Sequence, residues 1–209
     1  MKNKSILASR GFWLRQMRQW HWISAAVCLI GMLMFAFTGI TLNHASQIEA
    51  RPTVTERAAT LPQDLLAPLR AAAAIQGKQP VPDNVRAWIA KEISVAVDAR
   101  DAEWSREDVY VSLPRAGGDA WLSIELGSGE VRYERTDRGW IAYLNDLHKG
   151  RNTGAAWSWF LDIFAVACVV FCVTGLVLLQ LMANGRPSTW PLVGLGLVVP
   201  LLLAMFFIH

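Results

Sequence analysis

Three long apolar stretches dominate the hydropathy pattern of the chain, at residues 20–44, 155–182 and 190–209. The first contains no Lys, Arg, Asp or Glu, and the second has Asp162 as its single charged residue. A helix needs about 20 predominantly apolar residues to cross a bilayer. Each stretch reaches that length, so the pattern predicts three transmembrane helices in a lipid bilayer.

A short polar segment, residues 183–189, separates the second and third stretches. It contains Gly185 and Pro187, which are typical of a turn, so we expect the two helices to form a hairpin. The first stretch is longer than the apolar core of a signal peptide and is not followed by a clean small-residue cleavage site. We therefore expect the first helix to be retained.

The basic residues near the helix ends predict the orientation. Residues 1–19 contain no acidic residue and five basic ones, namely Lys2, Lys4, Arg10, Arg15 and Arg18. Segments rich in Lys and Arg stay on the cytoplasmic side of the membrane. We therefore expect the N-terminus and residues 183–189 in the cytoplasm, and residues 45–154 and the C-terminus outside.

The segment at residues 45–154 has the composition of a soluble α+β domain. An Ala- and Leu-rich run and two shorter periodic runs indicate helices, whereas alternating apolar and polar positions indicate half-buried strands. The predicted helices are Leu61–Gln76, Val81–Ala90 and Asp137–Lys149, and the predicted strands are Ile93–Val97, Asp108–Leu113, Ala120–Leu126 and Glu130–Arg135. Glycine-containing turns follow two of these strands, as expected of hairpins.

Composition excludes several classes of function. Hydrophobic residues make up 53% and charged residues 18% of the 209 residues, and the net charge is only +3 with no basic stripe, which argues against nucleic-acid binding. The three cysteines, Cys28, Cys168 and Cys172, all lie in the apolar stretches, so neither a disulfide framework nor a CxxC zinc site is expected.

The four histidines are the main candidates for chemistry. His21 lies at the cytoplasmic start of the first helix, whereas His44 lies 23 residues later, about 35 Å along a helix and hence at the outer end. His148 precedes the second helix and His209 ends the third, both on the outer side. The topology therefore predicts three histidines at one membrane face.

Several chemistries fit such a group. Two imidazoles on facing helices can bind a haem iron from both sides, with His44 and His148 preferred and His209 in reserve. The three histidines could instead bind copper or zinc, or simply lie among the lipid headgroups. Asp162 could orient an imidazole N–H or serve as a structural hydrogen-bonding group. We expect His21, which has no histidine partner on its side, to lie among tryptophans and headgroups.

Four segments of the chain together resemble the PepSY-associated transmembrane proteins, specifically their short three-helix branch. They are Phe-Thr-Gly-Ile-Thr-Leu-Asn-His at 37–44, Gly-Trp-Ile-Ala-Tyr-Leu-Asn-Asp-Leu-His-Lys-Gly at 139–150, Trp-Ser-Trp-Phe-Leu-Asp at 157–162 and Val-Thr-Gly-Leu-Val-Leu-Leu at 173–179. The resemblance implies a bacterial inner-membrane protein with a periplasmic PepSY-like α+β domain inserted between helices one and two.

Larger relatives in this family include haem-containing reductases of ferric siderophores. The resemblance places His44 and His148 at motif positions, with His209 a weaker match. This chain has fewer helices and histidines than those relatives, which implies one haem near the outer face rather than a two-haem path.

These expectations define a first hypothesis and two alternatives. The first is a b-type haem protein that transfers electrons at the periplasmic face, as a ferric-siderophore or flavin-linked reductase component with a periplasmic or membrane redox partner. The alternatives are a non-catalytic membrane adaptor whose domain binds a periplasmic protein, and a copper or zinc site. A bundle of three helices is thin for enclosing a porphyrin, which leaves room for a homo-oligomer.

Overall fold

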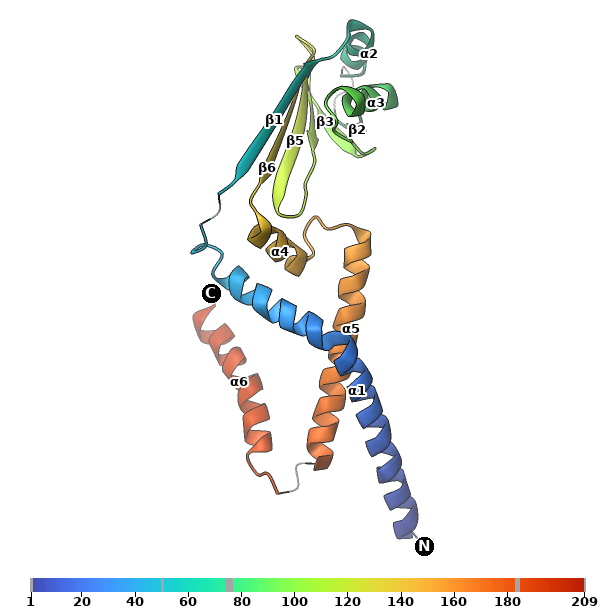
Figure 1. The fold of residues 1–209 in the computed structure, drawn as a ribbon, viewed down its shortest axis with the longest axis vertical. Coiled ribbons are helices and arrows are strands. Elements are labelled where there is room, and N and C mark those ends of the chain that lie inside the picture. Colours follow the sequence, from blue (N-terminus) through green and yellow to red (C-terminus); the bar gives the residue numbers. More distant parts are fainter. Residues whose placement is uncertain (1, 50, 74–76, 183–184, 209) are drawn as a thin grey trace. The chain divides into compact units, whose positions relative to one another are not determined.

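The computed structural model describes residues 2–49, 51–73, 77–182 and 185–208, with side chains from residue 10 onward. The elements, in chain order, are α1 (Lys2–Asn43), β1 (Thr53–Thr60), α2 (Gln63–Ala73), β2 (Gly77–Pro80), α3 (Asp83–Glu92), β3 (Asp101–Trp104), β4 (Asp108–Ser112), β5 (Gly118–Glu125), β6 (Glu130–Asp137), α4 (Trp140–Lys149), α5 (Ala155–Met182) and α6 (Thr189–Phe207) (Figure 1).

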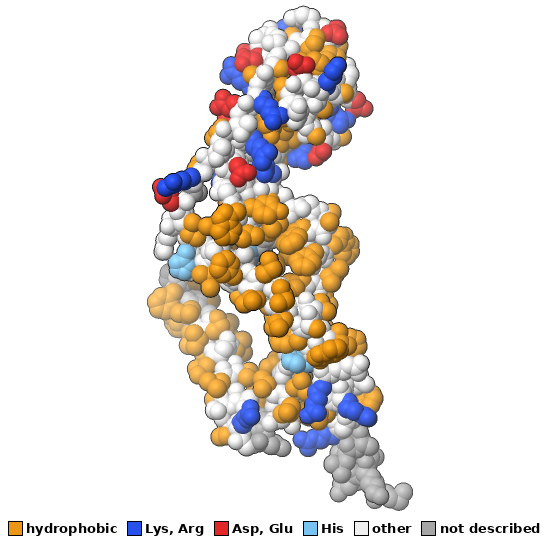
Figure 2. Space-filling view, viewed as in Figure 1, with side chains coloured by type: hydrophobic (Ala, Val, Ile, Leu, Met, Phe, Trp, Pro, Cys, Tyr) orange, Lys and Arg blue, Asp and Glu red, His pale blue; other side chains and the backbone are white. Residues whose placement is uncertain are grey.

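The chain divides into two compact units. One, here called the membrane unit, comprises the chain up to Met34 and from Trp159 onward; the other, the sheet unit, comprises Phe35–Ser158. Apolar side chains cover the long helices, whereas acidic side chains gather over the sheet (Figure 2). The long helices therefore carry a surface suited to lipid, and the sheet carries one suited to water.

The prediction of three transmembrane helices is confirmed. Arg10–Asn43, Ala155–Met182 and Thr189–Phe207 are each long and apolar enough to span a membrane. Most of their large apolar side chains are exposed on the protein surface, as lipid-facing side chains are. The chain is a multi-pass membrane protein. The first helix begins earlier than its apolar stretch, at Lys2.

The sheet has six antiparallel strands in the order β1-β6-β5-β4-β3-β2. Strands β3 to β6 follow one another as a meander, and α2 and α3 lie on one face (Figure 1). Along β5, buried residues alternate with partly exposed ones, so Leu122 and Ile124 face these helices. Leu66 from α2 and Ile89 from α3 complete this core with no exposed surface.

The predicted strand at Ile93–Val97 is wrong. Ile93, Val95 and Val97 are buried and the residues between them are exposed, which gives the alternation of a strand. The segment nevertheless forms no ladder, because it follows α3 directly and Ser94 has a positive φ of 53°. A left-handed residue breaks the extended backbone that a ladder requires.

Three strands were not predicted because two are only four residues long and one has no buried face. Strand β1 is exposed along nearly its whole length, and β2 is the four-residue segment Gly-Lys-Gln-Pro. The third is β3, another four-residue strand, in which Trp104 donates its indole N–H to the carbonyl of Gln79 at 2.8 Å. These strands are set by pairing with neighbours rather than by their own composition.

Candidate functional site

Helix α4 presents His148 to the last turns of α1, within the sheet unit. The helix is bounded by two glycines with positive φ, Gly139 at 85° and Gly150 at 66°. Gly150 is left-handed and ends the helix, whereas Gly139 precedes the helix with ψ 177°; glycine adopts both conformations without strain. His148 lies in the last turn and is half-buried, with its ring 4.9 Å from that of Phe35.

The hydrogen bonds around His148 involve one of its two ring nitrogens. Nδ1 lies 2.6 Å from Oγ1 of Thr38, and that hydroxyl lies 3.1 Å from the carbonyl oxygen of Phe35 on its own helix. If the hydroxyl donates to its helix carbonyl, it accepts from Nδ1 of His148. In that tautomer of the neutral ring, Nε2 keeps its lone pair for a ligand. The ring lies against the neighbouring Gly39, where a Cβ would be in ordinary van der Waals contact at 3.7 Å from Cε1.

A second polar contact lies one helical turn away. Oδ1 of Asn145 is 2.9 Å from Oγ1 of Thr41, and Asn145 is only 8% exposed. Asn145 and His148 are three residues apart on α4. Their respective partners, Thr41 and Thr38, are also three residues apart on α1. Residues at this spacing share a helix face. The matched three-residue spacing in the two helices is a sequence signal from which this pair of contacts could have been predicted.

His44 lies beyond the end of α1 and is exposed. Its Nδ1 donates to the carbonyl of Ile40 at 3.0 Å, because a carbonyl can only accept, so Nε2 is again the nitrogen left for a ligand. No direct contact joins His44 and His148 among the described residues. The two rings share one unit, and each presents Nε2 as its ligand atom.

The other predicted site residues do not join this pair. His209 lies outside the described residues. Asp162 belongs to the membrane unit, where it is exposed on α5 without a hydrogen bond or ion pair to a described residue of that unit. Within the described ranges, no three His, Cys, Asp or Glu side chains are grouped closely enough to bind a metal ion.

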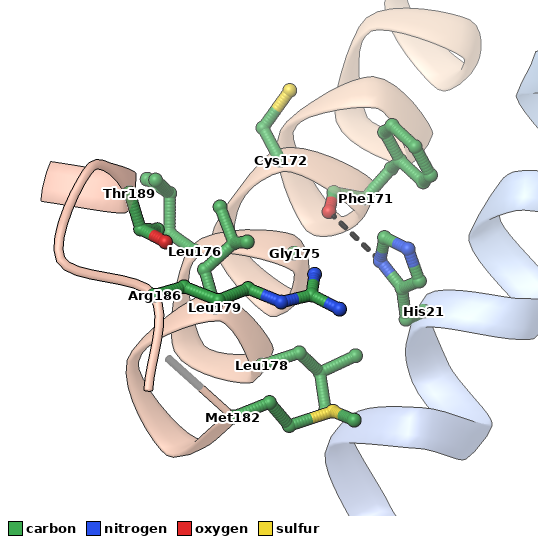
Figure 3. A pocket seen from close by; sticks show the side chains of 10 residues that line it. All are labelled: His21, Phe171, Cys172, Gly175, Leu176, Leu178, Leu179, Met182, Arg186 and Thr189. Carbon is green, nitrogen blue, oxygen red and sulfur yellow. Dashed lines mark hydrogen bonds between the residues drawn. The ribbon is translucent and has the colours of Figure 1, made fainter. Parts of the chain in front are cut away.

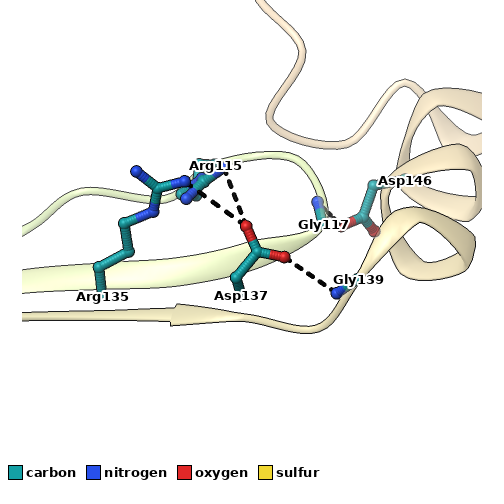
Figure 4. Close-up of polar contacts among 6 residues, drawn as sticks. All are labelled: Arg115, Gly117, Arg135, Asp137, Gly139 and Asp146. Atoms are coloured by element: carbon teal, nitrogen blue, oxygen red, sulfur yellow. Dashed lines mark hydrogen bonds and ion pairs between the residues drawn. The ribbon is translucent and has the colours of Figure 1, made fainter. Parts of the chain in front are cut away.

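The sheet anchors α4 through the loop between β4 and β5. The backbone N–H of Gly117 donates to Oδ2 of Asp146 at 2.8 Å, and Asp137 at the end of β6 accepts from the backbone N–H of Gly139 at 2.9 Å (Figure 4). Gly117 has a φ of 76°, and a Cβ there would lie 2.8 Å from Cβ of Tyr143 on α4. The helix that carries His148 is thus positioned by the sheet.

His21 has a similar environment in the membrane unit. Its Nδ1 lies 3.1 Å from Oγ1 of Thr174 and 3.2 Å from the carbonyl of Phe171, and its ring stacks on Phe171 at 4.5 Å. A Cβ at Gly175 would lie 3.2 Å from Cε1 of His21. The expectation that His21 lies among Trp20, Trp22 and headgroups is wrong, because Thr174 and Phe171 supply its polar and ring contacts within the protein.

Beside His21 is a cavity of about 610 Å³. Figure 3 shows the Arg186 guanidinium and the His21 ring directed into it, with leucine side chains, Met182 and Cys172 around them. Its walls are mostly apolar, as in ligand pockets generally.

Three helices long and apolar enough to span a membrane and an antiparallel sheet with helices on one face define the class: a multi-pass membrane protein with a sheet domain. The chain belongs to the family described as "Putative PepSY_TM-like", whose family model matches residues 12–209. Comparisons with curated proteins and with solved structures gave no match. The family assignment confirms the resemblance to PepSY-associated transmembrane proteins.

Proposed function

We propose that the protein is a b-type haem protein that transfers electrons at the periplasmic face of a bacterial inner membrane. His44 and His148 are the axial ligands in this proposal, with His209 in reserve. The observation that carries it is the hydrogen bond from Nδ1 of His148 to Thr38, which leaves Nε2 with a free lone pair in a half-buried position.

The chemistry of these residues fits haem. Iron-ligating histidines ordinarily donate their second N–H to an oxygen atom, which fixes the ring and raises its basicity. Both His148 and His44 donate in this way, to a hydroxyl and to a carbonyl. Phe35 beside His148 supplies an apolar aromatic wall. When bound, haem supplies a one-electron carrier whose potential depends on its axial ligands.

The role of the chain follows from its contacts. Thr38 holds the proton on Nδ1 of His148, Asn145 packs the helix face that carries the histidine, and the loop at Gly117 holds α4. If the two imidazoles held the haem iron from both sides, no position would be left on the iron for a substrate. Electrons would therefore pass at the cofactor edge to a periplasmic or membrane redox partner, as in a component of a ferric-siderophore or flavin-linked reductase.

The basic N-terminal segment supports the orientation. Arg10, Arg15 and Arg18 precede or begin the apolar part of α1, and the described residues of that segment include no acidic side chain. This charge bias favours a cytoplasmic N-terminus, and in the proposal the sheet domain is inserted between the first two membrane helices and faces the periplasm.

The proposal is tested by the absorption spectrum of the full-length protein purified in detergent, oxidised and then reduced with dithionite. A Soret band and a sharp α band are expected, and both should be lost or weakened in His148→Ala and His44→Ala but kept in His21→Ala. A protein with no haem bands after expression with added haem precursor would overturn the proposal. Bound copper or zinc without haem bands would instead support the metal alternative.

A further inference from the structure

A second cavity, of about 360 Å³, lies on the helix-facing side of the sheet. The strand register places it there. Leu122 of the core pairs with Tyr133, which pairs with Arg57, and the adjacent row of the ladder pairs Ala120 with Arg135. Directly opposed residues in neighbouring strands point to the same face. Tyr133, Arg57 and Arg135 therefore share the face of the buried core.

The cavity is strongly cationic. Its lining includes three arginines, Arg57, Arg115 and Arg135, and none of its described lining residues is acidic. One carboxylate, Asp137, lies 3.5 Å from both Arg115 and Arg135 (Figure 4). Three guanidinium charges against one carboxylate leave an excess of two positive charges around a small hollow.

Arg57 is held in place by backbone carbonyls, whereas Arg115 has a buried donor available to a ligand. Nη1 of Arg57 donates to the carbonyl of Ile93 at 2.5 Å and lies 3.3 Å from that of Ser94. Nη1 of Arg115 is buried and has no hydrogen-bond partner among the described residues. A buried donor without an acceptor is costly, and an anionic oxygen would relieve that cost.

We propose that this cavity binds a small oxyanion carrying two or three negative charges, of the phosphate or polycarboxylate class. Guanidinium groups recognise carboxylate and phosphate oxygens through paired hydrogen bonds, which match the excess charge and the free donor of Arg115. The apolar walls from Leu113, Val95 and Ala120 suit the carbon skeleton of a polycarboxylate. Binding here does not depend on haem.

The cavity also adjoins the anchor of α4. Arg115 precedes Gly117 in the loop that holds Asp146, and Asp137 accepts from Gly139 at the start of α4. An anion bound by Arg115 and Arg135 would compete with Asp137 for the same guanidinium groups. If the proposed haem function holds, an anionic iron chelate is the class of acceptor that this site would take.

Isothermal titration of the full-length detergent-solubilised protein tests the proposal, with phosphate and with citrate as separate probes. Saturable binding of at least one probe is expected, and comparing the two identifies the anion class. Arg135→Gln and Arg57→Gln should each weaken binding about tenfold, or about 1.4 kcal/mol, because each removes a charged donor from the cavity. Arg106→Gln, at an exposed arginine that does not line the cavity, is the matched control and should bind as the wild type.

A variant that binds more tightly excludes misfolding as the cause of weaker binding in the arginine variants. Asp137→Asn removes the competing charge and keeps an oxygen for the N–H of Gly139, so it should bind the anion about tenfold more tightly. Absence of binding by both probes would overturn the proposal, and so would equal weakening in Arg106→Gln and Arg135→Gln or weaker binding in Asp137→Asn. A protein that binds citrate but shows no haem bands would refute the proposed function alone.

Discussion

Nδ1 of His148 lies 2.6 Å from the hydroxyl oxygen of Thr38, and that hydroxyl lies 3.1 Å from the carbonyl oxygen of Phe35 on its own helix. When the hydroxyl donates to this carbonyl, the threonine serves the ring as an acceptor. The same geometry recurs at His21, where Thr174 donates to the carbonyl of Val170 at 2.7 Å and contacts Nδ1 at 3.1 Å. In both cases a glycine follows the threonine and leaves space for the ring.

Replacing Thr38 tests the tautomer directly. Thr38→Val keeps the shape of the side chain but removes the oxygen, so Nδ1 of His148 loses its acceptor. Loss of such a partner typically costs 10–100-fold in metal affinity, and we expect haem affinity to fall by about that factor. Titration of the haem-free protein with haem measures it. Thr38→Ser retains the oxygen, and a comparable loss in that control would contradict the explanation.

Asn145 should contribute mainly to stability. It is buried, and its removal in Asn145→Ala leaves Thr41 without its partner on α4. The expected cost is about 1–3 kcal/mol, seen as a lower midpoint of thermal unfolding in detergent. Asn43→Ala is the control, since Asn43 is an exposed residue at the end of α1. An unchanged midpoint for Asn145→Ala would show that the α1–α4 contact does not depend on this residue.

The loop at Gly117 should tolerate no side chain. Gly117→Ala would place a Cβ 2.9 Å from Cα of Tyr143 and force a residue other than glycine to a φ of 76°. We expect a loss of about 1–3 kcal/mol in stability and, because the loop must move away from Tyr143 and Asp146 on α4, weaker haem binding. Gly127→Ala is the control, because a Cβ there meets nothing within 4 Å. Equal effects of the two changes would refute the anchoring role.

Asp137 should make stability depend on pH in the acid range. The hydrogen bond from Gly139, together with Arg115 and Arg135, lowers the pKa of Asp137 below its ordinary value. A carboxylate with a lowered pKa in the folded state stabilises the protein above its unfolded-state pKa, and this contribution is lost as the pH falls through the folded-state pKa. We therefore expect unfolding midpoints to drop below about pH 4. Asp137→Asn should reduce that drop, and an unchanged acid profile would contradict the assignment.

Gly31 tests the packing of the membrane unit. A Cβ at this position would overlap the ring of Phe164 on α5, so Gly31→Leu should separate the two helices. Small residues permit close approach of membrane helices, which is the physical reason. Gly194→Leu on α6 is the control, since a Cβ there meets nothing within 4 Å. Stability to heat in detergent should fall only in Gly31→Leu.

The sequence predicted what depends on local composition. A long apolar run crosses a bilayer as a helix, so the three membrane helices were predicted from hydropathy alone. The alternation of apolar and polar residues predicted β4, β5 and β6. Strand β1 was missed because nearly all of its residues are exposed and its place is set by pairing with β6. The segment after α3 was misread because a buried irregular segment can alternate like a strand.

The site could be predicted only in part. His148 and His44 were singled out from their places near the helix ends, but the partners of His148 could not be, because a hydroxyl becomes an acceptor only once its own helix has taken its hydrogen. The contact of Thr38 with His148 joins residues 110 positions apart. The sequence around either residue does not indicate that the two side chains meet. The same holds for Arg57 and Arg115, which line the proposed anion cavity.

The sheet begins and ends at one place. Thr53, the first residue of β1, is the direct partner of Asp137, the last residue of β6, and paired residues in an antiparallel ladder lie about 5 Å apart. The chain therefore enters and leaves the sheet at adjacent positions. Such a module can be deleted and the two flanking segments joined by a short linker, or transplanted into another hairpin, without stretching the chain on either side. Its evolution could thus have proceeded separately from that of the helices.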